Sequence, residues 1–239
     1  MRRFYSATPI AESLVVLDDD EAHHLLHVLR AKAGDEVILF DGSGWEFPAR
    51  VTRCGKKQIE LEIVARAEVD RELPQPVTLG IALPKGDRQK WLVEKAVEMG
   101  AAKLVPLETE RGVAQPQPQV LDRLRRAVIE ASKQCGRNRL MEIAEPQAWS
   151  EWQRQVPAEA LRLVAHPTEV GDAASRAEAI RTARAGIYLA IGPEGGFSNE
   201  EVSGALALHW QPLQLGRRIL RIETAALAAL AQIGAALEG

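Results

Sequence analysis

Cysteine is nearly absent from this sequence of 239 residues, which contains only Cys54 and Cys135. The two lie far apart and in no spacing typical of metal ligands, so a disulfide scaffold is excluded and we expect no metal site. Isolated cysteines fit a reducing compartment, which predicts a cytoplasmic protein. Apolar runs approaching ~20 residues are also missing, which excludes a membrane-spanning helix. The first residues, MRRFYSATP, lack the apolar stretch of a secretory signal.

Two common nucleotide-binding motifs are missing as well. No G-x-G-x-x-G follows the first strand expected in the second half of the chain, and no G-x-x-x-x-G-K-[ST] occurs anywhere. The glycines of those motifs bring the backbone close to phosphate groups. Their absence disfavours a dinucleotide Rossmann site and a P-loop, so a small ligand must be held in another way.

A strongly basic balance is missing too, because the formal net charge is −3. This argues against a protein that coats nucleic acid without specificity, although local clusters of cations matter more than the total. The clusters are Arg2 and Arg3; Lys85, Arg88 and Lys90; Arg123, Arg125 and Arg126; Lys133, Arg137 and Arg139; and Arg217, Arg218 and Arg221. Any one of them is also compatible with a solvated helix face, which is our interpretation of 123–126.

The first part of the sequence has the pattern of short strands around one helix. Strands are expected at 14–17, 36–41, 47–53 and 58–67. Asp18 and Glu21 have the spacing of a capping box for a helix that runs to about residue 32. Short strands in quick succession predict a small barrel. The segment 71–76, with two prolines, is the best candidate for a linker.

After the linker the pattern changes to alternating strands and helices. Strands are expected at 77–82, 103–107, 161–165, 186–191 and 212–215, and helices at 88–99, 119–134, 172–184, 199–208 and 224–237. A loop with two prolines at 115–118 precedes the second helix. This alternation predicts an α/β fold with a mostly parallel sheet covered on both faces. We therefore expect two domains, 1–72 and 73–239.

Two segments near the carboxyl end have glycines where ligands bind in α/β folds. An apolar strand leads into Gly192-Pro193-Glu194-Gly195-Gly196, and Ser198 and Glu201 then have capping-box spacing. The second segment, LGRRILRIETAA from 215 to 226, also follows a strand and precedes an alanine-rich helix. Ligand crevices of open sheets lie at the carboxyl ends of strands, where glycine permits close backbone approach. A tight turn and an ordinary core helix are the simpler alternatives.

The strings IGPEGGFS and LGRRILRIETAAL resemble the signature of the RsmE family, the 16S rRNA (uracil-N3)-methyltransferases of the SPOUT superfamily. Further similar blocks occur in the same order along the chain: RRFY, HHLLHVLRAKAGDEV, DGSG, LPKGDRQKWLVEKAVEMGA, LETERGV and EASKQCGRNRL. Two positions depart from the family pattern. Arg217 replaces a common proline, and Ile222 replaces a frequent threonine, and both border the expected donor pocket.

The resemblance implies a SPOUT domain with a trefoil knot, which binds S-adenosylmethionine, and an N-terminal PUA-like barrel, which grips RNA. It implies a homodimer that acts on 16S ribosomal RNA or the assembled small subunit. The cofactor-binding residues would be His166, Pro167, Ile191, Gly192, Pro193, Glu194, Gly195, Gly196, Leu215, Gly216, Arg218, Ile219, Leu220, Glu223 and Thr224. Ile191, Leu215, Ile219 and Leu220 would pack against the faces of the adenine.

Methylation of uracil N3 requires removal of the N3 proton, because the anionic nitrogen is the better nucleophile. The target uridine must also be unpaired or flipped, since N3 lies on its pairing edge. Arg221 or Arg137 is expected to stabilise the anion, and a carboxylate or water to take the proton. Glu194 and Glu223 are the candidates for the carboxylate, although either could instead be structural. The expected RNA contacts are Arg2, Arg3, Arg30, Lys85, Arg88 and Arg137.

Three further interpretations stay open. Another SPOUT reaction, such as ribose 2′-O methylation, would use the same fold and cofactor. A non-catalytic RNA-binding assembly factor would keep the scaffold alone, which the largely intact donor segments disfavour. An α/β enzyme using another nucleotide is disfavoured by the absent phosphate loops.

His23 and His27 lie on one helical face, but no third metal ligand is evident.

Overall fold

The computed structural model describes residues 2–112, 116–167 and 173–239. The chain forms two compact units. The first comprises Met1–Arg71 and Ser132–Leu140, and the second comprises Glu72–Ala131 and Met141–Gly239. Residues 132–140 therefore belong to the first unit, although the sequence-based division places them in the second domain.

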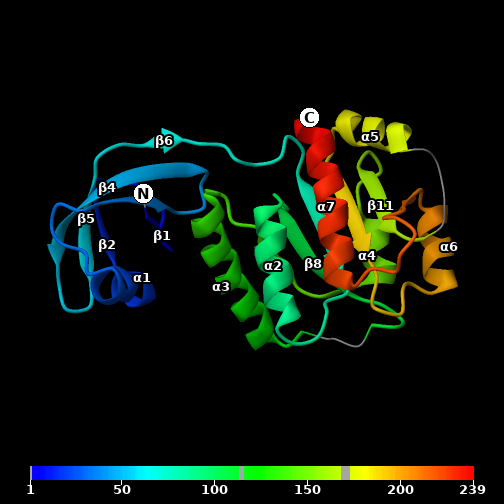
Figure 1. Cartoon of the computed structure of the whole chain (residues 1–239), viewed down its shortest axis with the longest axis horizontal. Helices are drawn as coiled ribbons and strands as arrows, with labels where there is room; N and C mark the ends of the chain where they lie inside the picture. The colour runs from blue at the N-terminus through cyan, green and yellow to red at the C-terminus, as the bar shows by residue number, and fades with distance from the viewer. Residues whose placement is uncertain (1, 113–115, 168–172) are drawn as a thin grey trace. The chain divides into compact units, whose positions relative to one another are not determined.

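The first unit contains a six-stranded curled sheet (Figure 1). Its strands are β1 (Arg3–Tyr5), β2 (Leu14–Leu17), β3 (Glu36–Phe40), β4 (Trp45–Cys54), β5 (Ile59–Ile63) and β6 (Ala67–Glu68). The order is β1-β3-β4-β5-β2, with β6 paired to β4; β1 and β3 are parallel and the other neighbours antiparallel. Alternate apolar residues of these strands face one core together with Leu25 of the helix. The expected small β domain thus has the form of a curled sheet.

The helix of this unit differs from its prediction. Helix α1 (Asp19–His23) continues as a π-helix, η1 (His24–Val28), and the chain leaves it with Arg30 at a φ of 53°. Asp18 occupies the N-cap without a side-chain hydrogen bond, so the predicted capping box is wrong. The carboxylate of Glu21, the other residue of the predicted box, instead accepts a hydrogen bond from Lys133 Nζ at 2.7 Å.

The second unit has a seven-stranded sheet in which every pairing is parallel. Its strands are β7 (Val77–Ile81), β8 (Lys103–Glu108), β9 (Glu142–Ile143), β10 (Gln147–Ala148), β11 (Leu161–Ala165), β12 (Ile187–Ile191) and β13 (Gln211–Leu213). The order is β10-β8-β7-β12-β11-β13, with β9 beside β8. The predicted parallel sheet is confirmed, and its central strand β7 is buried along its whole length.

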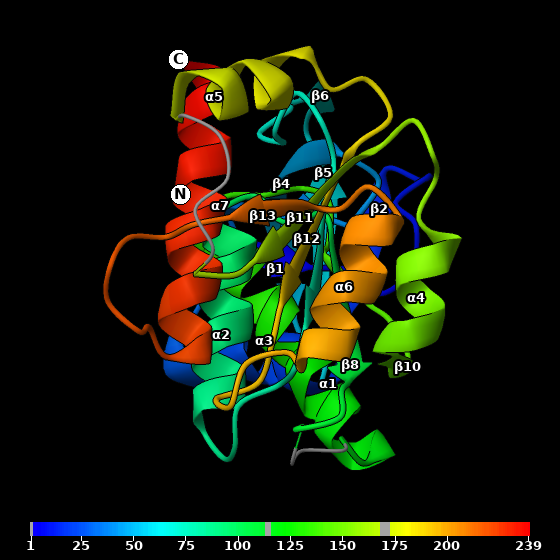
Figure 2. The same ribbon diagram turned by 90° about the vertical axis from the view of Figure 1, so that its right-hand side faces the viewer.

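Helices cover both faces of this sheet (Figure 2). They are α2 (Arg88–Glu98), α4 (Trp149–Gln155), α5 (Ala173–Thr182), α6 (Asn199–Ala207) and α7 (Ile222–Glu238). A further helix, α3 (Pro118–Cys135), begins in the second unit, and its residues from Ser132 onward belong to the first. Helices α2, α5 and α7 lie on one face, and α4 and α6 on the other. The first residue of the predicted 115–118 loop and residue 172 of a predicted helix lie outside the described residues. No helix in the described ranges is both long and apolar enough to span a membrane.

Helix α4 was not predicted, and an aromatic cluster explains why it forms. Its Trp149 and Trp152 are buried and pack with Trp210 and Phe197. Gly80 of β7 makes room for one of these rings, since a Cβ there would lie 2.5 Å from Trp152. The seven-residue helix is therefore stabilised by tertiary burial rather than by a periodic apolar pattern of its own.

Candidate functional site

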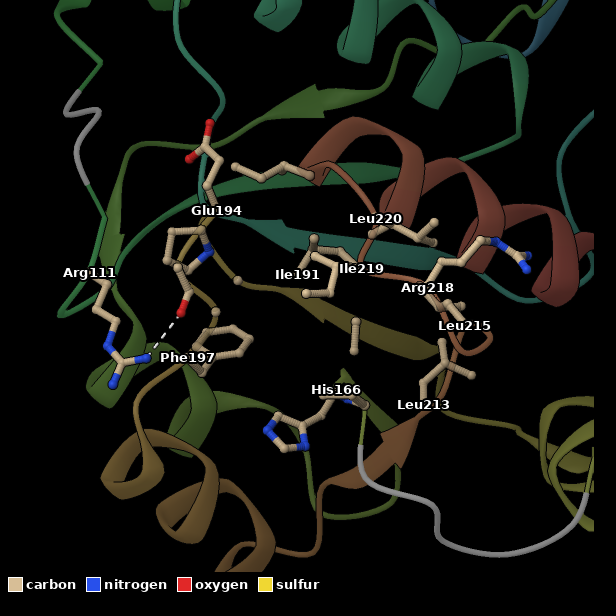
Figure 3. A pocket seen from close by; sticks show the side chains of 18 of the residues that line it. Arg111, His166, Ile191, Glu194, Phe197, Leu213, Leu215, Arg218, Ile219 and Leu220 are labelled. Carbon is tan, nitrogen blue, oxygen red and sulfur yellow. Dashed lines mark hydrogen bonds between the residues drawn. The ribbon is translucent and has the colours of Figure 1, made fainter.

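A pocket of about 440 Å³ lies where the loops after β11, β12 and β13 meet (Figure 3). These strands are parallel neighbours of one sheet, so their carboxyl ends emerge at the same edge. The lining residues are Arg111, Ala165, His166, Pro167, Ile191, Gly192, Pro193, Glu194, Gly195, Gly196, Phe197, Asn199, Leu213, Leu215, Gly216, Arg217, Arg218, Ile219, Leu220, Ile222 and Ala225. Every residue predicted to bind the cofactor lines this pocket except Glu223 and Thr224, which lie on the first turn of α7.

The glycine-rich loop after β12 is fixed at both of its ends. Gly192 faces Phe197 so closely that a Cβ on Gly192 would lie 3.0 Å from Cδ2 of the ring. At the far end, Ser198 Oγ accepts from Glu201 N–H, and the Glu201 carboxylate accepts from Ser198 N–H. The predicted capping box of α6 is confirmed. The loop backbone is thereby exposed to the pocket in one defined conformation.

The pocket wall is apolar near the strands and exposed at its rim. Ile191 and Leu213 are 2% and 1% exposed, and Leu215 and Leu220 are half-buried. Ile219, by contrast, is 99% exposed, so its side chain does not cover the pocket in this structure. Arg217, one of the two departures from the family pattern, is also exposed, whereas Ile222, the other, is buried at the start of α7.

One arginine links the two loops that form most of the pocket. Arg88, at the first position of α2, lies 3.3 Å from the Glu194 carboxylate and 3.5 Å from that of Glu223. Glu223 is buried, and its second oxygen has no hydrogen-bond partner. Arg88 was predicted to contact RNA, but its guanidinium is engaged with these two carboxylates. It therefore holds the glycine-rich loop against the start of α7.

Arg111 lines the pocket although sequence reasoning missed it. It follows β8, and its Nη1 donates to the Gly195 carbonyl oxygen at 3.0 Å (Figure 3). A signal was available: β8 is a parallel strand two places from β12, so residues just beyond its carboxyl end emerge at the ligand-binding edge. Phe197 and Leu213 were also missed as pocket residues, although Phe197 lies within the string IGPEGGFS and Leu213 within the strand predicted at 212–215.

The predicted catalytic residues are divided between the two units. Glu194 lines the pocket. Arg221 is exposed and forms the N-cap of α7, between the lining residues Leu220 and Ile222. Arg137 belongs to the first unit and is only 3% exposed. Its role in stabilising the anion or in contacting RNA stays a prediction.

The predicted RNA contacts divide into exposed and buried side chains. Arg2, Arg30 and Lys85 are exposed. The guanidinium of Arg3 donates to the Glu46 carboxylate and Asn138 Oδ1 and lies 5.0 Å from the centre of the Phe40 ring. These bonds hold residues 132–140 to the sheet of the first unit, and the RNA contact of Arg3 stays a prediction.

Metal-binding groups show no cluster in the described part of the chain. No set of three or more His, Cys, Asp or Glu side chains is arranged to hold an ion there. His23 and His27 do lie together, with ring centres 4.7 Å apart. Their pairing is a ring contact on the helix of the first unit.

Comparison with known proteins identifies the class to which this fold and pocket belong. A family described as an RNA methyltransferase domain matches residues 71–234, and a second, described as an RNA methyltransferase PUA domain, matches 17–64. The chain is 38% identical over 232 residues to the ribosomal RNA small subunit methyltransferase E of Synechocystis, covering 96% of this chain and 75% of that protein. A relative of the same name from Mycobacterium bovis is 31% identical, covering 97% and 90%.

Solved structures agree with this class. A ribosomal RNA small subunit methyltransferase E from Neisseria gonorrhoeae, bound to S-adenosyl methionine, is 33% identical with a TM-score of 0.89, covering 97% of this chain and 95% of that one. A methyltransferase from Legionella pneumophila in complex with the same cofactor has a TM-score of 0.89 at 34% identity, covering 98% and 97%. The chain belongs to the ribosomal RNA small subunit methyltransferase E family. The expected family and the α/β fold class with a PUA domain are confirmed.

Proposed function

We propose that this protein uses S-adenosylmethionine to methylate N3 of one uridine in the 16S RNA of the small ribosomal subunit. The observation that carries the proposal is the convergence of three loops on one pocket at the carboxyl edge of a parallel sheet. The same family membership supports an rRNA substrate. Exposed cations at Arg2, Arg30 and Lys85 supply sequence-independent contacts to its phosphates.

The pocket fits the cofactor in size and in chemistry. Its volume lies within the ~300–1,000 Å³ common for small-molecule sites. Ile191, Leu213, Leu215 and Leu220 offer apolar faces to an adenine ring, and the backbone of 192–196 offers hydrogen-bonding groups beside it. The glycine-rich loop is already held in place by Phe197 and the α6 cap, so the loop loses little conformational entropy when a ligand binds.

When bound, S-adenosylmethionine supplies an electrophilic methyl group. The protein must then favour the deprotonated uracil and hold N3 in line. Arg221, exposed at the N-cap of α7 next to two lining residues, would stabilise negative charge on the base. Glu194 is the better proton acceptor of the two carboxylates, because it lines the pocket and is partly exposed, whereas Glu223 is buried.

The remaining parts of the proposal concern organisation. Residues 1–72 would act as a PUA-like RNA-binding domain and residues 73–239 as the methyltransferase domain, with a trefoil knot at the three pocket loops. The protein would work as a homodimer in the cytoplasm, on free 16S RNA or on an assembled subunit. Two free cysteines, Cys54 and Cys135, are compatible with a reducing compartment.

Two measurements test the proposal. Isothermal titration calorimetry should show one molecule of S-adenosylmethionine bound per chain, and an absence of binding would refute the assignment. Mass-spectrometric mapping of 16S RNA from a strain lacking the protein should reveal one uridine that is methylated at N3 only after complementation. Methylation at a ribose 2′-hydroxyl instead would favour the alternative SPOUT reaction, and no change in any nucleotide would favour an assembly factor.

Arg221 provides the test of the chemical step. The Arg221→Ala variant should lose about 100-fold or more in single-turnover methyl transfer, because a preorganised charge next to the developing anion is removed. Its affinity for S-adenosylmethionine should stay near that of the unmodified protein, which calorimetry checks. The exposed Arg126→Ala on α3 is the matched control. A full transfer rate in Arg221→Ala would assign the role to another group.

A further inference from the structure

The two ends of the pocket differ in chemistry. Leu213 and Leu215 lie at one end, on the side of Arg218, whereas Arg111 lies at the opposite end beside the glycine-rich loop (Figure 3). Ile191 lies between them. Arginines thus lie near both ends. Of the two, within the described residues, only Arg111 is tied to the glycine-rich loop by a hydrogen bond, so we expect the anionic group of a ligand at that end and an apolar ring system at the other.

Arg111 is held in place by its surroundings before any ligand arrives. Its Nη1 donates to the Gly195 carbonyl at 3.0 Å. The residue before it is anchored as well, because Glu110 N–H donates to Glu201 Oε1 at 2.9 Å. Gly112 N–H closes the turn by donating to the Thr109 carbonyl at 3.0 Å. A guanidinium fixed on both sides loses little conformational entropy on binding.

Most hydrogen-bonding capacity of this guanidinium is unused. An arginine has five N–H donors in a planar fork, and the bond to Gly195 uses one of them. In the described part of the chain no carboxylate forms an ion pair with Arg111, whereas the carboxylate that lines the pocket, Glu194, is paired with Arg88. This end of the pocket therefore presents an uncompensated, exposed cation with the geometry that a carboxylate prefers.

We propose that Arg111 binds the carboxylate of the methionine part of S-adenosylmethionine. The inference rests on the proposed function, since it places the adenosine part against Leu213 and Leu215 and directs the amino-acid part toward Gly195. Arg111 is then a positioning residue. By holding the far end of the cofactor, it fixes where the methyl group lies relative to the entering base.

A set of three ligands isolates this contact. S-adenosylmethionine and S-adenosylhomocysteine carry the carboxylate, whereas 5′-methylthioadenosine keeps the adenosine and the sulfur but lacks the amino-acid part. Calorimetry on the full chain should show that Arg111→Ala weakens binding of the first two by about 10- to 100-fold, the loss of a charge-assisted pair. Affinity for 5′-methylthioadenosine should be unchanged. Arg111→Lys keeps the charge but not the planar fork of donors. Its affinity for S-adenosylmethionine and S-adenosylhomocysteine should lie between those of Arg111→Ala and the unmodified protein.

The outcomes separate this inference from the proposed function. Equal weakening of all three ligands by Arg111→Ala would mean that Arg111 shapes the loop. A loss of affinity for the two carboxylate ligands in Arg218→Ala, but not in Arg111→Ala, would place the carboxylate at the other end. Either result overturns the assignment. Unchanged affinity for all three with weaker binding of RNA would assign Arg111 to the nucleic acid and also overturn it. Absence of S-adenosylmethionine binding to the unmodified protein would instead refute the proposed function. The control is Arg126→Ala, which should bind every ligand normally.

Discussion

At the scale of single residues, the pocket depends on glycines, because a residue without a Cβ leaves room for a neighbouring group. Gly192 lies against the backbone nitrogen and ring of Phe197, at 3.1 Å and 3.0 Å from where its Cβ would be. Phe197 cannot retreat easily, because its ring packs on Trp149 with centres 4.9 Å apart. Gly195 is different: the nearest atoms to its Cβ would be in the Arg111 side chain, at 3.5 Å and 3.6 Å.

This contrast predicts the effect of adding one methyl group. Gly192→Ala should lower the free energy of unfolding by about 1–3 kcal/mol, because the added group overpacks a fixed ring. Gly195→Ala should change it by less than about 1 kcal/mol, since the contact with the Arg111 side chain is of ordinary van der Waals length. Urea denaturation of both variants measures the difference. Equal losses in the two would show that the Phe197 contact is not the cause.

At the scale of elements, the start of α6 connects the fold to the pocket. The Glu201 carboxylate accepts from Ser198 N–H with one oxygen and from Glu110 N–H with the other. One side chain therefore caps the helix and anchors the loop that carries Arg111. The helix α4 supports the same region through its tryptophans, which pack against Phe197 and Trp210.

Removing the cap should have a measurable cost. Ser198→Ala should destabilise the protein by about 1 kcal/mol, because the N–H of Glu201 loses its acceptor in a buried position. Ser203→Ala, on the exposed face of the same helix, is the matched control and should be neutral or slightly stabilising. Thermal and urea unfolding compare the two. A neutral Ser198→Ala would mean that water replaces the cap.

At the scale of the whole molecule, the first unit joins segments that are distant in the sequence. Glu46 on β4 accepts hydrogen bonds from Arg3 and from Arg71, and Arg71 also donates to the Gly136 carbonyl at 2.8 Å. Asn138 donates to the Val69 carbonyl at 2.9 Å. Burial alone would raise the pKa of Glu46, but the hydrogen bonds and charges of the two arginines outweigh it, and the pKa is lowered.

The lowered pKa of Glu46 determines how stability should depend on pH. A carboxylate with a lower pKa in the folded state stabilises that state above its unfolded pKa, and the contribution is lost as pH falls through the folded value. Stability should therefore decline below about pH 4. Glu46→Gln should already be destabilised at pH 7, by about 3 kcal/mol, because it leaves a buried arginine without its counter-ion.

Urea unfolding at several pH values between neutral and acid tests this prediction. The Glu46→Gln variant should show a shallower decline in stability toward acid pH than the unmodified protein. Glu36→Gln is the matched control, because its carboxylate pairs with Arg50 on the exposed surface of the same sheet and should matter little. Parallel pH profiles for Glu46→Gln and the unmodified protein would contradict the assignment.

Much of this molecule could be predicted from its sequence because the signals are local. The alternation of apolar strands and amphipathic helices predicted the parallel sheet. The glycines from 192 to 196, followed by the Ser198–Glu201 spacing, indicated the loop after β12. Ligand sites of such sheets lie at the strand ends, so most pocket residues followed from position alone. These features depend on the chain within a few residues, which is the range over which periodicity and capping act.

Only the tertiary structure decided which side chains meet. Arg88, Arg3 and Arg137 looked alike as members of basic clusters. Arg88 joins two pocket loops, whereas Arg3 pairs with Glu46 and Arg137 is buried, both in the first unit. The capping box predicted at Asp18 does not form, and Glu21 is hydrogen-bonded instead to Lys133, more than a hundred residues away. Charge pairing and burial depend on neighbours in space, and a sequence orders its residues only along the chain.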